Sequence, residues 1–145
     1  MERPVSTTVK GRALVPGTAR GTLLVAREPL SFWGGYDPET GEIIDRRHPL
    51  SGTTATGAIL AIPSTRGSST TTAVLLESVR RGTAPAALLC EGTDAFLALA
   101  AVVAEELYGK TVPVIALDAT DFATLRSGAT VEIRQDGTIE VGCKR

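Results

Sequence analysis

The segment at residues 58–82 constrains the fold of this chain most strongly. An apolar run at residues 58–62 ends at a proline, a short turn follows, and residues 73–81 have the pattern of a helix that closes at Gly82. This pattern predicts a strand, a turn and a helix, and the apolar run at residues 86–90 predicts the next buried strand. A strand–helix–strand unit of this kind favours a parallel sheet with a crossover helix.

The turn between this strand and helix carries Arg66, Gly67, Ser68 and Ser69. Gly67 would let the backbone approach a ligand closely, and the free N–H groups and positive dipole end of the helix favour an anion there. Ser68 and Ser69 would then lie beside a carboxylate or phosphate, with Arg66 adding a fork of donors. Serine and threonine also cap helices in most proteins, so helix capping alone is the simpler explanation of residues 68–72.

The remaining pattern predicts an α/β fold with two β layers. Strands are expected at residues 6–15 and 21–26, which suggest a hairpin, at 112–117, and in a C-terminal hairpin at 130–134 and 138–141. Further helical segments are expected at residues 95–108, capped by Thr93 or Asp94 and closed by Gly109, and at 122–126. We expect a central, partly parallel sheet with crossover helices, a second β layer from the terminal hairpins, and one domain over residues 1–145.

Residues 27–57 form a long segment rich in glycine and proline, with little periodicity. Loops of this length in a compact domain are usually functional. The segment holds the chain's only tryptophan, Trp33, and its only histidine, His48. An exposed tryptophan followed by Gly34 and Gly35 favours a subunit interface or a lid over core packing. His48 reads as a loop or interface residue.

Composition narrows the classes of partner. The chain has 15 basic and 16 acidic residues, so electrostatics give no case for nucleic acid or an anionic membrane. Cys90 and Cys143 lack the paired spacing of a metal site, and Cys90, at the end of an apolar run, is expected to be a buried, inert thiol. There is no signal-peptide pattern and no apolar stretch of membrane-spanning length, so a cytoplasmic location is the default expectation.

The hydroxyl-rich turn does not carry a complete catalytic set. Nucleophilic serine catalysis needs a base, commonly a histidine held by a carboxylate, and His48 lies between Arg47 and Pro49 with no elbow motif around either serine. A phosphate-carrying swivelling domain would place a histidine near the turn, where this chain has serine and threonine. A stand-alone module that binds anions without catalysis remains open from the residue types.

Three blocks of sequence carry a resemblance to a known family. Residues 29–45, with Phe-Trp-Gly-Gly and Asp-Pro-Glu-Thr-Gly, residues 48–50, and Arg66-Gly67-Ser68-Ser69 resemble, in the same order, the small subunit or swivel domain of aconitase X. Gly-Ser-Ser also occurs in the swivel domains of ordinary aconitases and isopropylmalate isomerases, where arginine, glutamate and histidine follow. Three threonines follow here, which favours the aconitase X branch and implies different substrate contacts.

The resemblance implies a swivelling β/β/α fold and a dehydratase of hydroxy acids. It assigns Ser68 as the alkoxide base, leaving Ser69 as the alternative, and Arg66, Gly67 and Ser69 as substrate-binding residues. It makes the long loop an interface or lid, through Phe32, Trp33, Gly34, Gly35 and Asp37, although Asp37 before Pro38 is equally compatible with a simple turn.

The resemblance also implies a missing partner. An iron–sulfur cluster, which assists departure of the hydroxyl as a Lewis acid, is expected on a large catalytic subunit and not on this chain, which should be inactive alone as half of a heterodimer. The family's substrates are cis-3-hydroxy-L-proline and mevalonate 5-phosphate. The alanine-rich, lysine-poor composition leans towards a bacterial source and the hydroxyproline activity.

Overall fold

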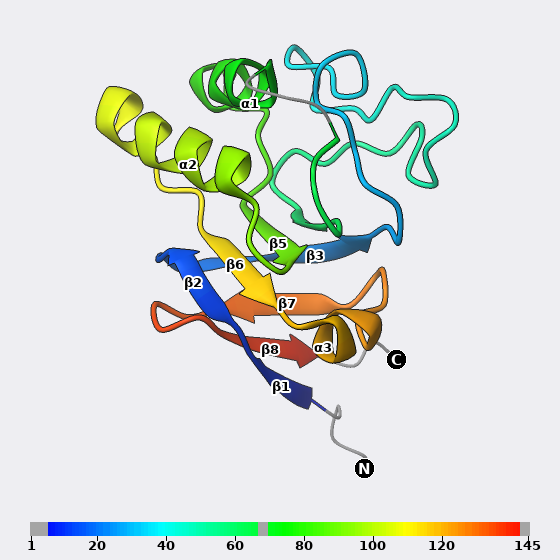
Figure 1. Cartoon of the computed structure of the whole chain (residues 1–145), viewed down its shortest axis with the longest axis vertical. Helices are drawn as coiled ribbons and strands as arrows, with labels where there is room; N and C mark the ends of the chain where they lie inside the picture. Colours follow the sequence, from blue (N-terminus) through cyan, green and yellow to red (C-terminus); the bar gives the residue numbers. More distant parts are fainter. Residues whose placement is uncertain (1–5, 67–69, 143–145) are drawn as a thin grey trace.

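The computed structural model describes residues 6–66 and 70–142 (Figure 1). Within them the elements, in chain order, are β1 (Ser6–Lys10), β2 (Arg12–Val15), β3 (Ala19–Val25), β4 (Ile59–Ala61), α1 (Thr70–Arg81), β5 (Ala87–Glu91), α2 (Ala95–Tyr108), β6 (Val114–Leu117), α3 (Ala119–Ala123), β7 (Thr130–Ile133) and β8 (Thr138–Gly142). The hydrogen-bonded strand order is β1-β8-β7-β3-β4-β5-β6-β2.

The strands form two layers, and the two long helices form a third. Strands β3, β4, β5 and β6 are parallel neighbours, whereas β1, β8 and β7 pair antiparallel with one another and join the sheet through β3. Figure 1 shows α1 and α2 on one face of the parallel strands and the β1, β7 and β8 layer on the other. The predicted partly parallel sheet, crossover helices and second β layer are therefore confirmed.

Each side of the parallel strands has its own apolar core. Leu60 and Leu88 belong to the core under the helices, whereas their chain neighbours Ile59 and Leu89 belong to the core between the β layers. Successive side chains of a strand point to opposite faces, so a strand covered on both faces must be apolar at every position. This explains the unbroken apolar runs from which these strands were predicted.

The N-terminal strands differ from the prediction. Residues 6–15 do not form a hairpin with β3: they divide at Gly11 into β1, which pairs with β8, and β2, which pairs with β6. At Gly11 the chain passes from one β layer to the other, and its N–H donates to the carbonyl of Gly137 at 3.1 Å. A Cβ at Gly11 would collide with the side chain of Ile115, so this crossing requires glycine. The predicted C-terminal hairpin, β7–β8, is confirmed.

The helix ends follow the capping signals closely. Asp94 is the N-cap of α2, and Gly109, with φ of 66°, is its left-handed C-cap, as predicted. Helix α1 begins at Thr70, three residues before the predicted start, so its threonines lie in the first helical turn. Helix α3 also begins earlier than predicted, because the side chain of Asp118 accepts from the N–H of Asp121 and caps it.

Candidate functional site

The candidate site lies where the parallel strands end. Beyond β4 the chain continues to Arg66 beside the start of the long loop: the N–H of Leu30 donates to the carbonyl of Ser64 at 3.2 Å, and the N–H of Arg66 donates to the carbonyl of Leu30 at 2.9 Å. In an open parallel sheet, ligands bind at the carboxyl ends of the strands. The long loop and the segment that leads to Gly67 are thus direct neighbours at that edge.

Of the predicted site residues at positions 66–69, the structure describes the first. Gly67, Ser68 and Ser69 lie outside the described residues. Arg66 is described and exposed, and its guanidinium makes no hydrogen bond or ion pair with any other described residue. Because no carboxylate in the described chain neutralises it, Arg66 is able to serve an anionic ligand.

Asp94 connects the Arg66 segment to α2. Its Oδ2 accepts hydrogen bonds from the N–H of Thr65 at 2.7 Å and from the Thr65 hydroxyl at 2.8 Å. Its Oδ1 accepts from the N–H groups of Phe96 and Leu97, each at 3.1 Å. Asp94 is only 8% exposed, so this carboxylate is buried and fully hydrogen-bonded. The residue before Arg66 is thereby held against the N-terminus of α2.

The long loop is folded around its own aromatic pair. Phe32 and Tyr36 are buried, and their ring centroids lie 5.1 Å apart. The Tyr36 hydroxyl donates to the carbonyl of Thr83 at 2.7 Å, and burial raises the pKa of the Tyr36 phenol above its usual value. The Thr83 hydroxyl in turn donates to the carbonyl of Pro38 at 2.6 Å. The loop is therefore anchored to the residues that follow α1.

Trp33 differs from its buried neighbours in the loop. It is 68% exposed, whereas the backbone around Gly35 is packed so closely that a Cβ there would collide with the carbonyl of Ser31. Gly34, with φ of 79°, faces open space. Among these predicted interface or lid residues, Phe32 and Gly35 support the loop from inside, whereas the indole of Trp33 is exposed. The interface or lid role itself stays a prediction.

Asp37 and His48 have local structural partners. Asp37 accepts the N–H of Glu39 through its side chain at 2.9 Å, which is the turn that a residue before proline favours. His48 is buried; its Nδ1 accepts the N–H of Leu50 at 3.1 Å, and its Nε2 lies 3.3 Å from the carbonyl of Glu28. With Nδ1 as the acceptor of the Leu50 N–H, Nε2 is the ring nitrogen that faces Glu28, so His48 holds two parts of the loop together.

The described residues do not fit a metal or iron–sulfur site. No group of three or more histidine, cysteine, aspartate or glutamate side chains in residues 6–66 and 70–142 is arranged to hold a metal ion. Cys90 is buried as predicted, its thiol lies 3.3 Å from the carbonyl of Gly92, and burial raises the pKa of that thiol to about 11. A thiol of this kind stays protonated and is a poor ligand. None of the described helices combines the length and apolarity needed to cross a bilayer.

Sequence reasoning missed the role of Thr65 and half of the role of Asp94. Asp94 stood out as a helix cap, because capping depends on residues only two or three positions away. Its bond to Thr65 joins residues 29 positions apart, and no local pattern reports such a contact. The one available signal was that both residues follow predicted parallel strands, whose carboxyl ends meet at one edge.

Known proteins share both this sequence and this fold. Residues 8–141 match the aconitase X swivel domain family. A cis-3-hydroxy-L-proline dehydratase of Pseudomonas aeruginosa is 55% identical over 106 residues, which are 73% of this chain and 18% of that protein. The phosphomevalonate dehydratase small subunit of Pyrococcus furiosus is 38% identical over 129 residues, which are 89% of each chain. A chain of the crystal structure of Thermococcus kodakaraensis aconitase X (holo-form) is 31% identical, with a TM-score of 0.83 over 93% of this chain and 98% of that one.

These similarities differ in how much of the relative they cover. This chain spans less than a quarter of the length of the two hydroxyproline dehydratases that it matches, at 18% and 23%, but nearly all of the Pyrococcus furiosus small subunit. The family match covers both β layers and the helices between β1 and β8. The predicted resemblance is thus confirmed, and the chain belongs to the aconitase X swivel domain family.

Proposed function

We propose that this chain is the small subunit of a heterodimeric dehydratase of the aconitase X type, a hydro-lyase that removes water from a small hydroxy acid. One observation carries the proposal: a protein named as a dehydratase small subunit aligns with this chain over 89% of both sequences. In this proposal the chain supplies half of an active site, and a large catalytic subunit supplies the other half.

The half site is proposed to centre on Ser68, with Ser69 as the alternative. Ser68 acts as the base that removes a proton beside the substrate carboxylate. A serine hydroxyl has a very high pKa, so it becomes a base only where positive charge and N–H dipoles surround it. Two described features support this: the exposed guanidinium of Arg66, which has no partner among the described residues, and the start of α1 at Thr70, which follows the serines in the sequence. Arg66, Gly67 and Ser69 bind the substrate carboxylate.

The proposed substrate is cis-3-hydroxy-L-proline. The higher identity, 55%, is to a hydroxyproline dehydratase, against 38% to the phosphomevalonate dehydratase small subunit. The second candidate is mevalonate 5-phosphate, and separate observations favour it. The relative of matching length has that activity in its name, and Arg46, Arg47 and Arg66 are exposed cations without ion-pair partners among the described residues.

The proposed partner is the large subunit, which also carries the iron–sulfur cluster that the family implies. The described part of this chain offers no ligand set for such a cluster. Trp33 is proposed as an anchor of the contact with that subunit, together with Gly34 and Asp37 beside it. A large exposed aromatic on a rigid support is the usual form of an interface hot spot. We place the assembled enzyme in the cytoplasm. We propose neither nucleic acid nor a membrane as a partner.

The proposal is tested by co-expressing this chain with the large subunit of the same organism and assaying both substrates. We expect dehydration of cis-3-hydroxy-L-proline by the pair, none by either chain alone, and loss of at least about 100-fold in kcat for Ser68→Ala. The control is Ser51→Ala, because Ser51 is an exposed loop serine.

Each contrary outcome identifies the part of the proposal that fails. Full activity in Ser68→Ala with loss in Ser69→Ala moves the base to Ser69. Turnover of mevalonate 5-phosphate alone replaces the substrate. A chain that binds phosphate or carboxylates tightly by calorimetry, and forms no complex with the large subunit, is a stand-alone anion-binding module, and the proposal is wrong.

A further inference from the structure

We propose that Asp94 is a positioning residue of this half site, and that it acts through Thr65 on the neighbouring Arg66. The inference rests on the proposed function, because it takes Arg66 and Ser68 as the groups that meet the substrate. Nothing in the capping role of Asp94 requires it to contact Thr65.

The two carboxylate oxygens of Asp94 have separate tasks. Oδ1 accepts the N–H groups of Phe96 and Leu97 and completes the N-cap of α2. Among the described residues, Oδ2 makes no hydrogen bond to the helix: the two that it accepts, at 2.7 and 2.8 Å, come from Thr65. A helix cap needs one acceptor, which serine or threonine also supplies. The second oxygen is therefore committed to the neighbouring segment.

The contacts of Thr65 lie directly beside the proposed site. Residues 62–66 lie between the long loop, where the Arg66 N–H donates to Leu30, and β5, where the Glu91 N–H donates to the carbonyl of Pro63 at 3.0 Å. Asp94 adds a side-chain contact to these two backbone contacts, and it does so at Thr65, one residue before Arg66. Arg66 and Thr70 are the described residues that flank residues 67–69 in the sequence.

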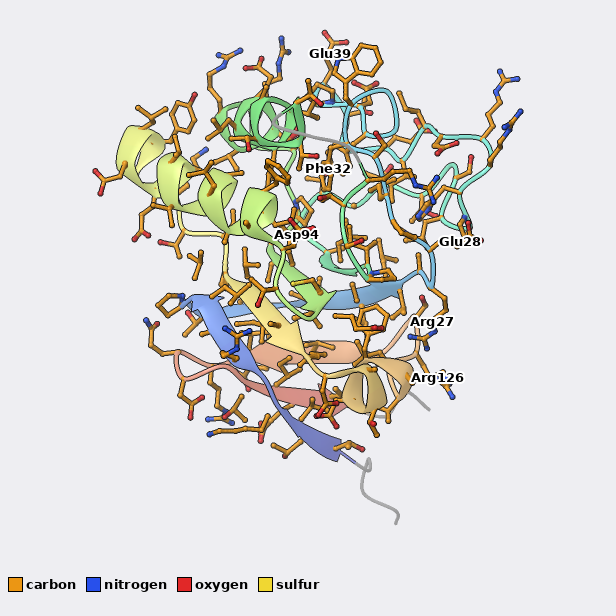
Figure 2. The ribbon with its side chains drawn as sticks, in the orientation of Figure 1. Arg27, Glu28, Phe32, Glu39, Asp94 and Arg126 are labelled. Carbon is orange, nitrogen blue, oxygen red and sulfur yellow. The ribbon has the colours of Figure 1, made fainter. Side chains whose placement is uncertain are left out.

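Burial makes this contact strong and directional. Asp94 is 8% exposed, and Figure 2 shows it at the start of α2 on the side that faces the long loop and Phe32. A buried carboxylate is stable only when its oxygens accept hydrogen bonds, and bonds to a charged acceptor are shorter and stronger than neutral ones. Oδ2 therefore holds Thr65 in one place, and a displacement of about 1 Å in an active site can cost about 100-fold in rate.

Two substitutions separate positioning from capping. Asp94→Ser keeps an N-cap hydroxyl for α2 but is too short to reach Thr65 as well. Thr65→Val keeps the shape of the side chain and removes only the hydroxyl bond to Oδ2. In the co-expressed pair we expect kcat to fall 10- to 100-fold for Asp94→Ser and 3- to 10-fold for Thr65→Val. Asp94→Asn keeps an oxygen acceptor for the helix cap but places an amide NH₂ group, which cannot accept a hydrogen bond, opposite the N–H of Thr65. We therefore expect its loss of kcat to lie between the losses of these two variants.

The matched control is Asp118→Ser. Asp118 is an N-cap like Asp94, its side chain accepting the N–H of Asp121 at 2.7 Å, but its carboxylate makes no contact with the Arg66 segment. We expect unchanged kcat in this variant. The double variant Asp94→Ser, Thr65→Val should lose no more activity than Asp94→Ser alone, because both changes break one contact.

The readouts distinguish this inference from a structural role and from failure of the proposed function. If activity falls only in proportion to the folded fraction or to the amount of bound large subunit, Asp94 is merely structural and the inference is wrong. Full activity in Asp94→Ser, with Ser68→Ala inactive, overturns the inference and leaves the proposed function intact. Full activity in both Ser68→Ala and Ser69→Ala overturns the proposed function itself.

Discussion

The long loop and helix α2 differ in both secondary structure and burial: the loop is irregular but holds buried side chains, whereas the helix is regular but exposes several of its own. The loop, residues 27–57, contains only isolated β-bridges, yet Leu30, Phe32, Tyr36 and Ile43 in it are fully buried. Helix α2 is regular over its whole length, yet four large apolar side chains on it are exposed: Phe96, Leu99, Val102 and Leu107. Regular structure and core packing are thus independent properties in this domain.

Hydrogen bonding explains how an irregular segment can be buried. Backbone groups of the loop pair within the loop, with residues 64–66 or with the residues after α1, as when the N–H of Ile43 donates to the carbonyl of Thr53 and the N–H of Ala55 donates to the carbonyl of Gly41. Buried polar groups are tolerated when they are paired, whatever the secondary structure.

In α2 the inner face is mostly alanine, with Ala100, Ala101 and Ala104 buried, so the helix lies close to its neighbours and its larger side chains point outwards.

The largest expected effect separates two adjacent loop residues. Phe32→Ala should destabilise the domain by about 3–5 kcal/mol, because it empties a fully buried site, whereas Trp33→Ala should change stability by less than about 0.5 kcal/mol. Urea unfolding measures both changes. It is followed by circular dichroism because Trp33→Ala removes the only tryptophan and with it the tryptophan fluorescence signal. If Trp33 anchors the contact with the large subunit as proposed, Trp33→Ala should instead weaken binding of that subunit. Equal destabilisation by the two variants would show that the loop has no core of its own.

A smaller difference is expected within α2. Leu97→Ala removes a buried side chain and should cost about 2–5 kcal/mol, whereas Leu99→Ala, at an exposed position of the same helix, should cost less than about 0.5 kcal/mol. Both variants replace leucine with alanine in the same helix, so the change in helix propensity is the same. The difference between their free energies of unfolding therefore reports burial alone. Thermal unfolding of the isolated chain measures it. A large cost for Leu99→Ala would mean that this face is covered in solution, and light scattering would then reveal self-association.

The smallest effect concerns the Tyr36 hydroxyl. Tyr36→Phe removes one bond to Thr83 and should cost about 1 kcal/mol at neutral pH. Burial raises the pKa of Tyr36 in the folded state above the unfolded value near 10. The contribution of the protonated hydroxyl to the free energy of unfolding is therefore fully present below pH 10 and is lost as the pH rises beyond it. The stability gap between the wild type and the variant should therefore narrow above pH 10. A gap that is the same at pH 7 and pH 10.5 would contradict the burial of this phenol.

The predictable parts of the fold and site were those with local causes. Residues 86–90 and 95–108 were assigned because strand hydrophobicity and helix caps depend on near neighbours, and β5 and α2 match them closely. The prediction of an N-terminal hairpin failed because strands 6–10 and 12–15 pair with residues about a hundred or more positions away. The Asp94–Thr65 contact and the burial of Phe32 were out of reach for the same reason.

The division of the first strand at Gly11 has a consequence for how the domain comes into being. The first two strands occupy the two ends of the strand order, and their partners, β8 and β6, are completed only at residues 142 and 117. Long-range pairing of this kind makes folding slow and late. On the ribosome, β2 cannot pair before residue 117 has emerged, and β1 cannot pair before residue 142 has emerged. Before these points, each of the two N-terminal strands lacks the strand with which it pairs in the folded domain.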